Sequence, residues 1–486
     1  MKNAKIKIII FGIESKKIER CEEMKKKNVW VFTGIMILVL LIGAGVPLYF
    51  VKYANKEGKV EKDKSTFSVH TDYEVFQNVP IMTGKNLKFS EARDVGGGDY
   101  KIDVNSTTMD EYQQYLSLLE KKGFTKKLDN GENGLEGFVY TSHYQKDDVL
   151  VVVTHITKLS QTIITACEDT TLSEYLFYDE AYVADNIASA QTILHVPEME
   201  SVGNSMVIQL KNGRFILYDG GLEGELPYLL DYMESLVPEG EKPIIDAWLI
   251  SHAHADHMGI LKTFANNKSY GERVYIENVF FNAPSNRAIE IQKGYDSVQQ
   301  MVTFCNSASA YLKSTDGNGP KTYRTRLGER YYFNDFTIDI MYSQELIPPE
   351  EWDTWNSTST VYMFTIEGQK MMLTGDVDWE CQLLYMDMYD SKYFDLTLYQ
   401  APHHGKNVFN EVSSYYDTIR TVIYPTYVSG SNSSDSSFLG RWVQNEYLKS
   451  VSLESMSWGD GTKILTFPYE VGTAKSLPVM FDRTKK

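Results

Sequence analysis

The stretch "DAWLISHAHADHMG" at residues 246–259 constrains the fold and the chemistry of this chain more than any other. It places three of the nine histidines and an aspartate within six residues, directly after an apolar run. Imidazole and carboxylate groups are the protein ligands that suit a divalent ion such as zinc. Histidines that only complete a hydrophobic core do not explain three together at this spacing. The stretch therefore predicts a metal site at the end of a buried strand.

Two more polar clusters follow apolar runs further along the chain. Asp376 stands in "LTGDVD" after "KMM", and His403 and His404 stand in "APHHG" after "DLTLYQ". Polar residues at the ends of strands commonly form the site of a sheet-based fold. We therefore expect both clusters to lie beside the first one.

The spacing within the first cluster predicts that its ligands divide between two ions. Alternate residues of an extended loop point the same way, so His252 and His254 can bind one ion. Asp256 and His257 can then turn toward a second ion. Asp376 between the two can bridge them, and two ions roughly 3.5–4 Å apart share and acidify a water. We therefore predict two divalent metal ions as cofactors, zinc first and manganese as the alternative.

From residue 193 onward the sequence predicts an α/β fold. "SMVIQLKNGRFILYDGG" contains two apolar strands joined by an Asn-Gly turn. An amphipathic helix is expected at 226–236, and strands at 244–250 and 273–281. This alternation of strands and helices is typical of an α/β sandwich.

A smaller α+β domain is expected before it, at residues 72–185. "STTMDEYQQYLSLLEKKGF" has the apolar stripe of a helix, with Thr107 or Thr108 as its cap. "GFVYTSHY", "DDVLVVVTHI" and "SQTIITAC" read as a meander of strands. His143 and His155 in these strands are expected to be core or strand-surface residues rather than ligands.

The N-terminal region predicts a membrane anchor. Residues 29–51 contain no charged residue over 23 positions, which is enough to cross a bilayer core of about 30 Å. Nine Lys and Arg residues lie in the preceding segment 1–28, so we expect that segment in the cytoplasm and the rest of the chain outside. Residues 52–71 are expected to be a linker. A cleaved signal peptide is the alternative, and it would also export the folded part.

The exported part is strongly acidic. The first 64 residues hold 14 of the 48 basic and 7 of the 65 acidic residues, which leaves 34 basic against 58 acidic, a net charge of −24. Such a charge repels polyanions, which argues against a nonspecific nucleic-acid-binding protein. The four cysteines are too few and too far apart for a disulfide framework or a CxxC metal site.

The chain resembles the metallo-β-lactamase superfamily. His252-x-His254-x-Asp256-His257 is similar to the HxHxDH signature of that superfamily, and Asp376 in "LTGD" is similar to its bridging-aspartate motif. The order of "GNSMVIQLKNGRFILYDGG", "DAWLISHAHADHMG", "LTGD", "YQAPHHG" and "GDGTKILTFP" most resembles the branch that contains the C-terminal domain of ComEC competence proteins. The resemblance covers about residues 195–470. It implies an αββα sandwich over 193–486, usually two metal ions, and hydrolysis of an ester, amide or phosphodiester.

The resemblance also implies roles for individual residues. The metal ligands would be His252, His254, Asp256, His257, Asp376 and one of His403 and His404, with the choice within that last pair left open. Asp256 would in addition orient the attacking water or take its proton. Asp219 would fix the strand end and the ring N–H groups of the histidines.

One departure from the family concerns the first ion. No histidine lies between His257 and Asp376, so the usual third histidine of the first site is missing, as it also is in the ComEC-like branch and in exported phosphocholine esterases. Water, Asp256 or a residue such as Asn282 could take its place. The oxygen-rich ligand set favours phosphate esters over β-lactams.

Two functions follow from these observations. The first is a membrane-anchored, extracellular metallohydrolase that cleaves a phosphodiester by attack of a metal-held hydroxide. Its substrate would be extracellular nucleic acid or a cell-envelope polymer, with nucleic acid a partner only as substrate. The alternative is a noncatalytic metal-binding scaffold of the envelope or of a competence system. A DNA-uptake channel is disfavoured because only one membrane segment is predicted, and the oligomeric state stays open.

Overall fold

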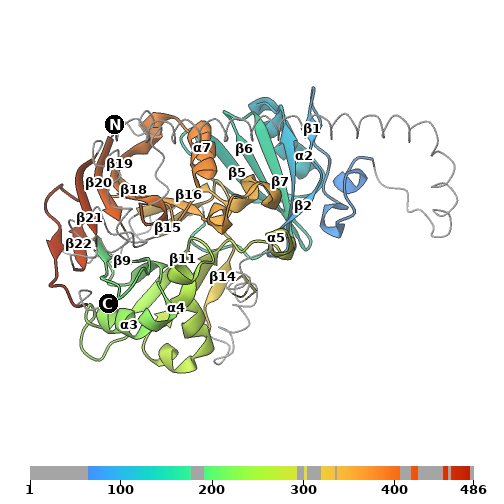
Figure 1. The fold of residues 1–486 in the computed structure, drawn as a ribbon. Coiled ribbons are helices and arrows are strands. Elements are labelled where there is room, and N and C mark those ends of the chain that lie inside the picture. Colours follow the sequence, from blue (N-terminus) through green and yellow to red (C-terminus); the bar gives the residue numbers. More distant parts are fainter. Residues whose placement is uncertain are drawn as a thin grey trace, which may run out of the picture. The chain divides into compact units, whose positions relative to one another are not determined.

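A computed structural model describes most of the chain beyond residue 63 (Figure 1). The described residues are 64–176, 191–292, 300, 302–303, 319–333, 336–405, 418–424, 452–457 and 461–481. Asp63–Lys486 form one compact unit. The predicted segments 1–28 and 29–51 lie outside the described residues, and no helix within the described part is long and apolar enough to cross a membrane. The predicted division into domains at 72–185 and 193–486 stays a prediction.

The first sheet is antiparallel and comprises the strands between residues 88 and 167. Its order is β1-β3-β7-β6-β5-β4, with β2 beside β3. The strands are β1 Lys88–Phe89, β2 Arg93–Gly96, β3 Asp99–Asn105, β4 Thr125–Asp129, β5 Val139–Lys146, β6 Val149–Ile156 and β7 Gln161–Cys167. Strands β5 to β7 are the predicted meander, which is confirmed. The 3-10 helices Phe67–Val69 and Glu74–Phe76 precede the sheet.

Helix α2, Met109–Lys121, forms a hydrophobic core with the first sheet. Its N-cap is Thr108, whose side chain accepts a hydrogen bond from the Glu111 backbone N–H at 3.2 Å, while the Glu111 carboxylate accepts one from the Thr108 N–H at 2.9 Å. This capping box satisfies donors that the first helical turn leaves free. The buried stripe is Tyr112, Tyr115, Leu116 and Leu119, the residues expected from the sequence.

Two mixed sheets make up the rest of the described chain. The second sheet has the order β14-β13-β11-β10-β9-β8-β22-β23, with β12 beside β11. Its strands are β8 Ile193–Val196, β9 Ser205–Gln209, β10 Phe215–Asp219, β11 Ile244–Ile250, β12 Tyr275–Ile276, β13 Asn278–Phe281, β14 Lys321–Tyr323, β22 Lys463–Thr466 and β23 Lys475–Ser476. The third sheet runs in the order β15 to β21. Its strands are β15 Arg330–Phe333, β16 Phe336–Tyr342, β17 Val361–Ile366, β18 Gln369–Leu373, β19 Asp395–Gln400, β20 Thr418–Tyr424 and β21 Ser452–Ser457.

One strand prediction needs correction. The run 273–281 was expected to be a single strand, but the structure divides it into β12 and β13. Glu277 lies between them, where its backbone N–H donates to the Ile245 carbonyl at 2.9 Å and its carboxylate pairs with Arg214 at 3.0 Å. The chain thus stays hydrogen-bonded to β11 at Glu277, and the division between β12 and β13 falls at this charged residue.

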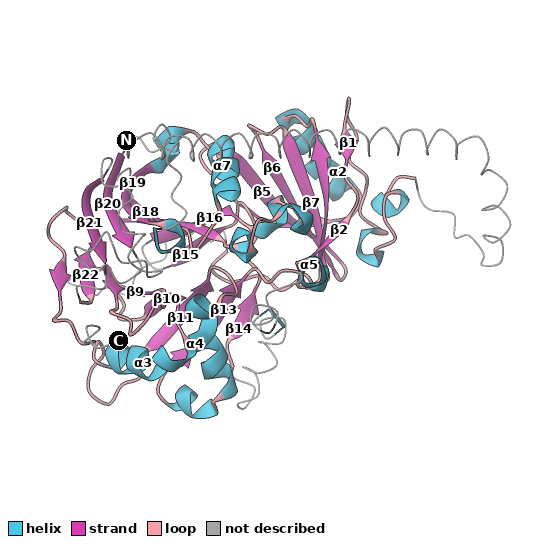
Figure 2. Cartoon of the chain, in the orientation of Figure 1, coloured by secondary structure: helices cyan, strands magenta, loops and turns pink. Residues whose placement is uncertain are grey.

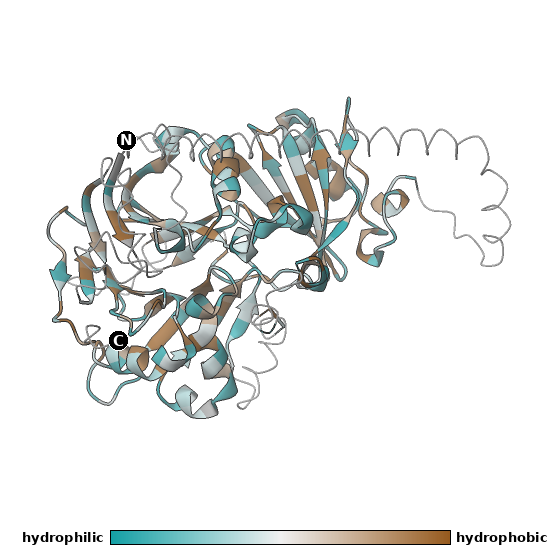
Figure 3. Ribbon diagram, in the orientation of Figure 1, coloured by the Kyte–Doolittle hydropathy of each residue, from teal (hydrophilic) through white to brown (hydrophobic). Residues whose placement is uncertain are grey.

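The second and third sheets share one hydrophobic core. The cluster includes Ile216 and Leu249 from the second sheet and Ile338 and Phe364 from the third, each at most 2% exposed. Figure 3 shows apolar residues along the strands and hydrophilic residues on many of the turns between them. Burial of this shared interior is the main stabilising contribution to the fold.

Helices cover the outer faces of these two sheets (Figure 2). Helices α3 Leu226–Glu234 and α4 Ala255–Asn266 pack on the second sheet, where Trp248 meets Phe264 edge to face at 6.2 Å. Helix α7, Trp379–Met388, packs on the third sheet through a second cluster. The remaining helices are α5 Asn286–Ile291 and the 3-10 helices Glu223–Glu225, Lys268–Glu272, Gln344–Leu346, Pro349–Glu351, Trp355–Thr358, Ser391–Phe394 and Pro402–Gly405. The described residues thus form a mixed α/β fold with two packed sheets between helices, as predicted.

A buried charge network joins the first sheet to the other two. The guanidinium of Arg326 donates to both carboxylate oxygens of Asp99 on β3, at 2.6 and 3.1 Å. Glu329 accepts from the backbone N–H of Arg326 at 2.9 Å and bonds His143 Nε2 on β5 at 3.0 Å. Because charges out of water need partners, this network ties the first sheet to residues 326–329. His143 is thereby a structural residue, as the sequence predicted.

Candidate metal centre

The polar residues of the candidate site follow the carboxyl ends of four strands, at one edge of the two packed sheets. Strands β10 and β11 run parallel in the second sheet, and β18 and β19 run parallel in the third, so their carboxyl ends point the same way within each sheet. The Thr360 N–H donates to the Ser251 carbonyl at 2.9 Å, and the Gly375 N–H donates to the Tyr218 hydroxyl at 2.8 Å. These bonds hold the two edges together, as the polar clusters at strand ends led us to expect.

Asp219 at the end of β10 organises the first cluster. It is buried, and its φ of 52° lies in the left-handed region, a strained conformation for a residue other than glycine. Its carboxylate accepts hydrogen bonds from the Ser251 N–H at 2.7 Å and from Asn204 Nδ2 at 2.8 Å. It also bonds His257 Nδ1 at 2.7 Å. The predicted contacts of Asp219 are confirmed for the strand end and for His257, while the ring of His252 bonds Ser251 instead. With the proton on Nδ1, the His257 Nε2 lone pair would be available to an ion.

The backbone of the first cluster differs from the prediction. An extended loop was predicted for the whole cluster, but it is limited to residues 251–254. Asp256 and His257 lie in the first turn of α4. The His254 carbonyl accepts from the N–H groups of His257 and Met258 at 3.1 and 3.0 Å, which starts the helix at this point. An acidic residue in the first turn suits the positive end of the helix dipole.

The first group of candidate ligands is His252, His254 and Asp376, whose ligand atoms all lie within 4.8 Å of one another. His252 Nε2 and His254 Nδ1 are 2.8 Å apart. His252 Nε2 lies 4.0 Å from Asp376 Oδ2. The Ser251 hydroxyl bonds the other ring nitrogen of His252 at 3.0 Å and so orients the ring.

The second group is Asp256, His257, Asp376 and His404, also within 4.8 Å. His257 Nε2 lies 3.0 Å from Asp376 Oδ1, and His404 Nε2 lies 3.1 Å from Asp256 Oδ2. Asp376 belongs to both groups, in the position of the expected bridge. Of the two adjacent histidines, His404 is the one in this group.

His403 lies beside both groups without being part of either. Its Nε2 is 3.8 Å from Asp376 Oδ2, and its Nδ1 is 3.2 Å from Asn356 Nδ2. His403 and His404 have φ values of 50° and 55°, and the His403 N–H donates to the Gly375 carbonyl at 3.1 Å. This left-handed turn is how two neighbouring side chains both reach the centre.

Asn282, considered above as a substitute ligand, is committed elsewhere. Its Nδ2 donates to Glu345 Oε2 at 2.7 Å, and its Oδ1 accepts from Gln344 Nε2 at 2.9 Å. It therefore holds the end of β13 in place. Asp256, the other protein substitute, lies in the second group.

The charges of the centre favour a cation. Burial opposes protonation of His257, but the carboxylates of Asp376, Asp219 and Asp256 raise its pKa well above the usual range. Burial lowers the pKa of His252 well below its usual value, aided by the neighbouring histidines. His252 is therefore neutral at physiological pH, as a candidate ligand needs to be, whereas His257 is protonated beside the carboxylates.

Metal binding should accordingly strengthen as the pH rises. His257 holds its proton across the neutral range because its pKa is raised, and an ion must displace that proton. One displaced proton corresponds to about a tenfold gain in affinity per pH unit. Zinc titrations against a competing chelator between about pH 6 and 7.5 check this expectation. An affinity that does not change over this range would contradict the assignment of His257.

The donor set fits a metal ion on the evidence of its buried atoms. His257 Nε2 and Asp376 Oδ1 are buried, lie 3.0 Å apart and have no other hydrogen-bond partner within the described residues. A buried nitrogen and carboxylate oxygen at this separation need a proton or a cation between them. Nitrogen and carboxylate oxygen ligands suit zinc and similar ions. The residues present therefore fit a divalent ion.

Asp219→Asn should weaken metal binding although Asp219 belongs to neither ligand group. Asparagine keeps the size but loses the charge that orients His257, and loss of such a partner costs about 10–100-fold in metal affinity. Chelator competition on the purified variant measures the change. Asp231→Asn is the matched control, because Asp231 pairs with Arg273 on the surface and is 71% exposed at its side chain. Equal affinity in the two variants would contradict the role given to Asp219.

Several supporting residues give no signal in the sequence. Asn204 and Asn356 belong to residue types that are common in loops, and only the fold brings them to Asp219 and His403. The Ser359 hydroxyl accepts a hydrogen bond from the Asp376 N–H at 3.2 Å. Gly375 does give a sequence signal, because a glycine directly before Asp376 suggests a tight turn. Its φ is 57°, and a Cβ at this position would lie 2.8 Å from Ser251 Cβ.

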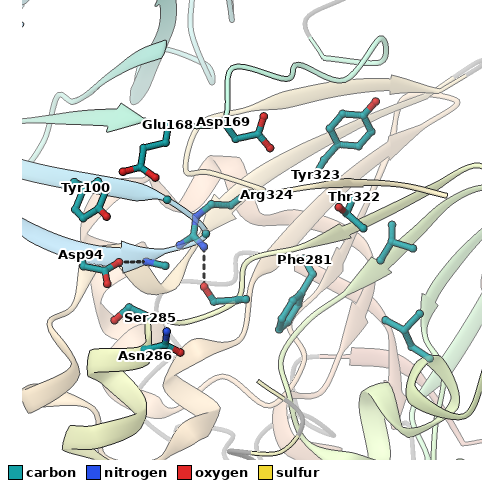
Figure 4. A pocket seen from close by; sticks show the side chains of 16 residues that line it. Asp94, Tyr100, Glu168, Asp169, Phe281, Ser285, Asn286, Thr322, Tyr323 and Arg324 are labelled. Carbon is teal, nitrogen blue, oxygen red and sulfur yellow. Dashed lines mark hydrogen bonds between the residues drawn. The ribbon is translucent and has the colours of Figure 1, made fainter. Parts of the chain in front are cut away.

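A separate cavity of about 460 Å³ lies at the ends of β13 and β14 (Figure 4). It is lined by residues such as Tyr100, Glu168, Phe281 and Tyr323, and none of the candidate metal ligands lines it. Arg324 on its wall donates to the carbonyls of Ala283 and Val95 at 2.7 and 2.6 Å. Its guanidinium is thus engaged in joining β2 to the end of β13.

Comparison with known proteins supports the metal centre through one family match. Residues 199–294 match the family model described as the Metallo-beta-lactamase superfamily. No curated protein matches the chain. The matched segment contains β9 to β13 and the first polar cluster.

Three solved structures are similar at low identity. The metallo-beta-lactamase fold protein YhfI from Bacillus subtilis is 14% identical, with a TM-score of 0.33, over 55% of this chain and 95% of that one. Zinc-bound PqqB from Methylobacterium extorquens is 9% identical, with a TM-score of 0.27, over 48% and 71%. A metallo-beta-lactamase from Hirschia baltica is 10% identical, with a TM-score of 0.19, over 60% and 71%. The segment 199–294, which contains the cluster of three histidines and an aspartate, is similar in sequence to the metallo-beta-lactamase superfamily over 96 of the 486 residues.

Proposed function

We propose that this chain is a metal-dependent hydrolase of the ComEC-like branch that cleaves a phosphodiester. The observation that carries the proposal is the pair of ligand groups that share Asp376. His252 and His254 would hold one divalent ion with Asp376, and Asp256, His257 and His404 would hold another with it; zinc is the ion we propose. When bound, the ions polarise a phosphoryl oxygen and lower the pKa of a water.

Asp256 is the residue best placed to orient the attacking water. Burial opposes its ionisation, but His257 and His404 lower the pKa of its carboxyl below the usual range. It is therefore an ionised acceptor at any physiological pH. Its side chain is 24% exposed, against 2% for Asp376, so it reaches the open side of the centre. One carboxylate oxygen bonds His404 at 3.1 Å, which leaves the other to accept a hydrogen bond from water.

The substrate class we propose is a phosphodiester, either of a cell-envelope polymer or of extracellular nucleic acid. Oxygen-rich ligands suit phosphate esters, and the net charge of −24 after residue 64 disfavours nonspecific binding of long polyanions of either kind. Metal-loaded protein should turn over bis(p-nitrophenyl) phosphate faster than p-nitrophenyl phosphate or a chromogenic β-lactam. Faster turnover of the β-lactam, or none of the diester, would overturn the proposal.

We also propose that the hydrolase is held outside the cell by residues 29–51. The support is the uncharged run of 23 residues with basic residues before it. Added protease should then remove the C-terminal part from intact cells, while a cytoplasmic marker survives. Full protection of the C-terminal part would contradict export.

A noncatalytic metal-binding scaffold is the second candidate. It is favoured by the first ligand group, which has three protein ligands and lacks the third histidine of the family. Stoichiometric metal without turnover of any phosphodiester, amide or ester would support it over the enzyme.

A further inference from the structure

His403 is only partly buried, as is His254, whereas His252, His257 and His404 are buried. The side chain of His403 is 15% exposed, against 0% for His252 and His257 and 2% for His404. Its Nε2 is nevertheless only 3.8 Å from Asp376 Oδ2. The ring therefore lies close to the ligand groups and is still partly open to solvent.

Asn356 presents its side-chain nitrogen to one ring nitrogen of His403. Asn356 Nδ2 donates to His403 Nδ1 at 3.2 Å. An accepting Nδ1 places the proton of a neutral imidazole on Nε2. In this tautomer Nε2 is a hydrogen-bond donor, and His403 belongs to neither group of candidate ligands.

The loop that carries Asn356 is fixed to the metal motif. Asp378, two residues after Asp376, accepts hydrogen bonds from Thr354 Oγ1 at 2.7 Å and Ser357 Oγ at 3.0 Å. Asn356 lies between these two residues and is 4% exposed. The donor that orients His403 is thus held by the same short segment that supplies the shared carboxylate.

We propose that His403 binds the substrate and no metal ion, donating a hydrogen bond from Nε2 to a nonbridging oxygen of the phosphoryl group. Asn356 is the positioning residue that keeps this donor in place. The inference rests on the proposed function and adds a residue that recognises its phosphoryl oxygens. A partly exposed donor beside two cation-binding groups is suited to an oxyanion, because the donor and the cations attract it from the same side.

Binding of inorganic phosphate to the metal-loaded full-length protein tests the inference. His403→Ala and Asn356→Leu should each weaken phosphate about tenfold, the effect of losing one hydrogen bond to a charged group. Both variants should keep the metal content of the wild type. His403→Gln places an N–H near the position of Nε2 and should recover part of the affinity. His404→Ala is the contrasting variant, which should lose metal.

Other results would overturn the inference. Loss of an ion in His403→Ala would make His403 a ligand. The proposed contact would be contradicted if that variant bound phosphate as tightly as the wild type, or if the wild type bound no phosphate. A ¹⁵N spectrum of the ion-free protein that shows the His403 proton on Nδ1 would contradict the role of Asn356. If phosphate binds through His403 but no diester is hydrolysed, the proposed function is contradicted and the contact between His403 and phosphate is still supported.

Discussion

Asp376→Ala should abolish hydrolysis and strip the protein of metal. Asp376 is the one residue common to both ligand groups, so its loss removes a ligand from each. Loss of a supporting residue alone typically costs about 10–100-fold in affinity or activity, and loss of the shared ligand should exceed the upper end of that range. Metal analysis and diester turnover of the same preparation measure both effects.

Two further variants show whether the loss is due to the missing carboxylate charge of Asp376. Asp376→Asn keeps the volume but not the charge, and it should fail nearly as completely because a neutral amide is a poor bridge between two cations. Asp395→Asn is the control: its side chain is 56% exposed at the start of β19 and pairs with Arg420, so activity should stay within about twofold. Full metal content with full turnover in Asp376→Ala would show that the centre lies elsewhere.

Arg326→Met should destabilise the folded chain by about 3–5 kcal/mol. Methionine fills much of the space, but Asp99 and Glu329 are 1% and 0% exposed and would each lose a buried partner. Burial disfavours the charge on Arg326, yet Asp99 raises the pKa of Arg326 well above the usual range, so the guanidinium stays charged. Urea unfolding followed by tyrosine and tryptophan fluorescence measures the change in the free energy of unfolding.

Arg287→Met is the matched control for Arg326→Met. Arg287 pairs with Glu350 at 3.4 Å, and both side chains are more than half exposed, so the change should be within about 1 kcal/mol. A similar small effect for Arg326→Met would mean that the first sheet is not held to the rest by this network.

The candidate metal ligands could be predicted because histidine and aspartate at close spacing are themselves the signal. Three histidines at close spacing, an aspartate after an apolar run and a second pair of histidines are each unusual, and strands β10, β11, β18 and β19 could be placed from their apolar residues. What could not be read from the sequence was the contact between the ends of these strands, which the structure shows. Asp219 was likewise predictable, since a carboxylate at a strand end before such a motif has few other uses.

The helix that begins within the motif was harder to predict. Gly259 disfavours a helix by its intrinsic propensity, and an extended loop was therefore the natural expectation. In the structure the glycine is required by packing, because a Cβ there would lie 2.7 Å from the Glu223 backbone nitrogen. Tertiary contact thus overrides propensity at this position.

The role of Asn356 could not be predicted for a different reason. Its partner His403 lies 47 residues away in the chain, and an asparagine in a polar loop is common. Contacts of this kind depend on how the third sheet and its loops fold, which local sequence patterns do not encode.

The metal content of the purified protein tests the central claim most directly. Two divalent ions per chain are expected by mass spectrometry after dialysis, and a mild chelator should remove one first, because the first group has one protein ligand fewer than the second. Fewer than one ion per chain under zinc-replete conditions would contradict the claim that these residues form a metal centre.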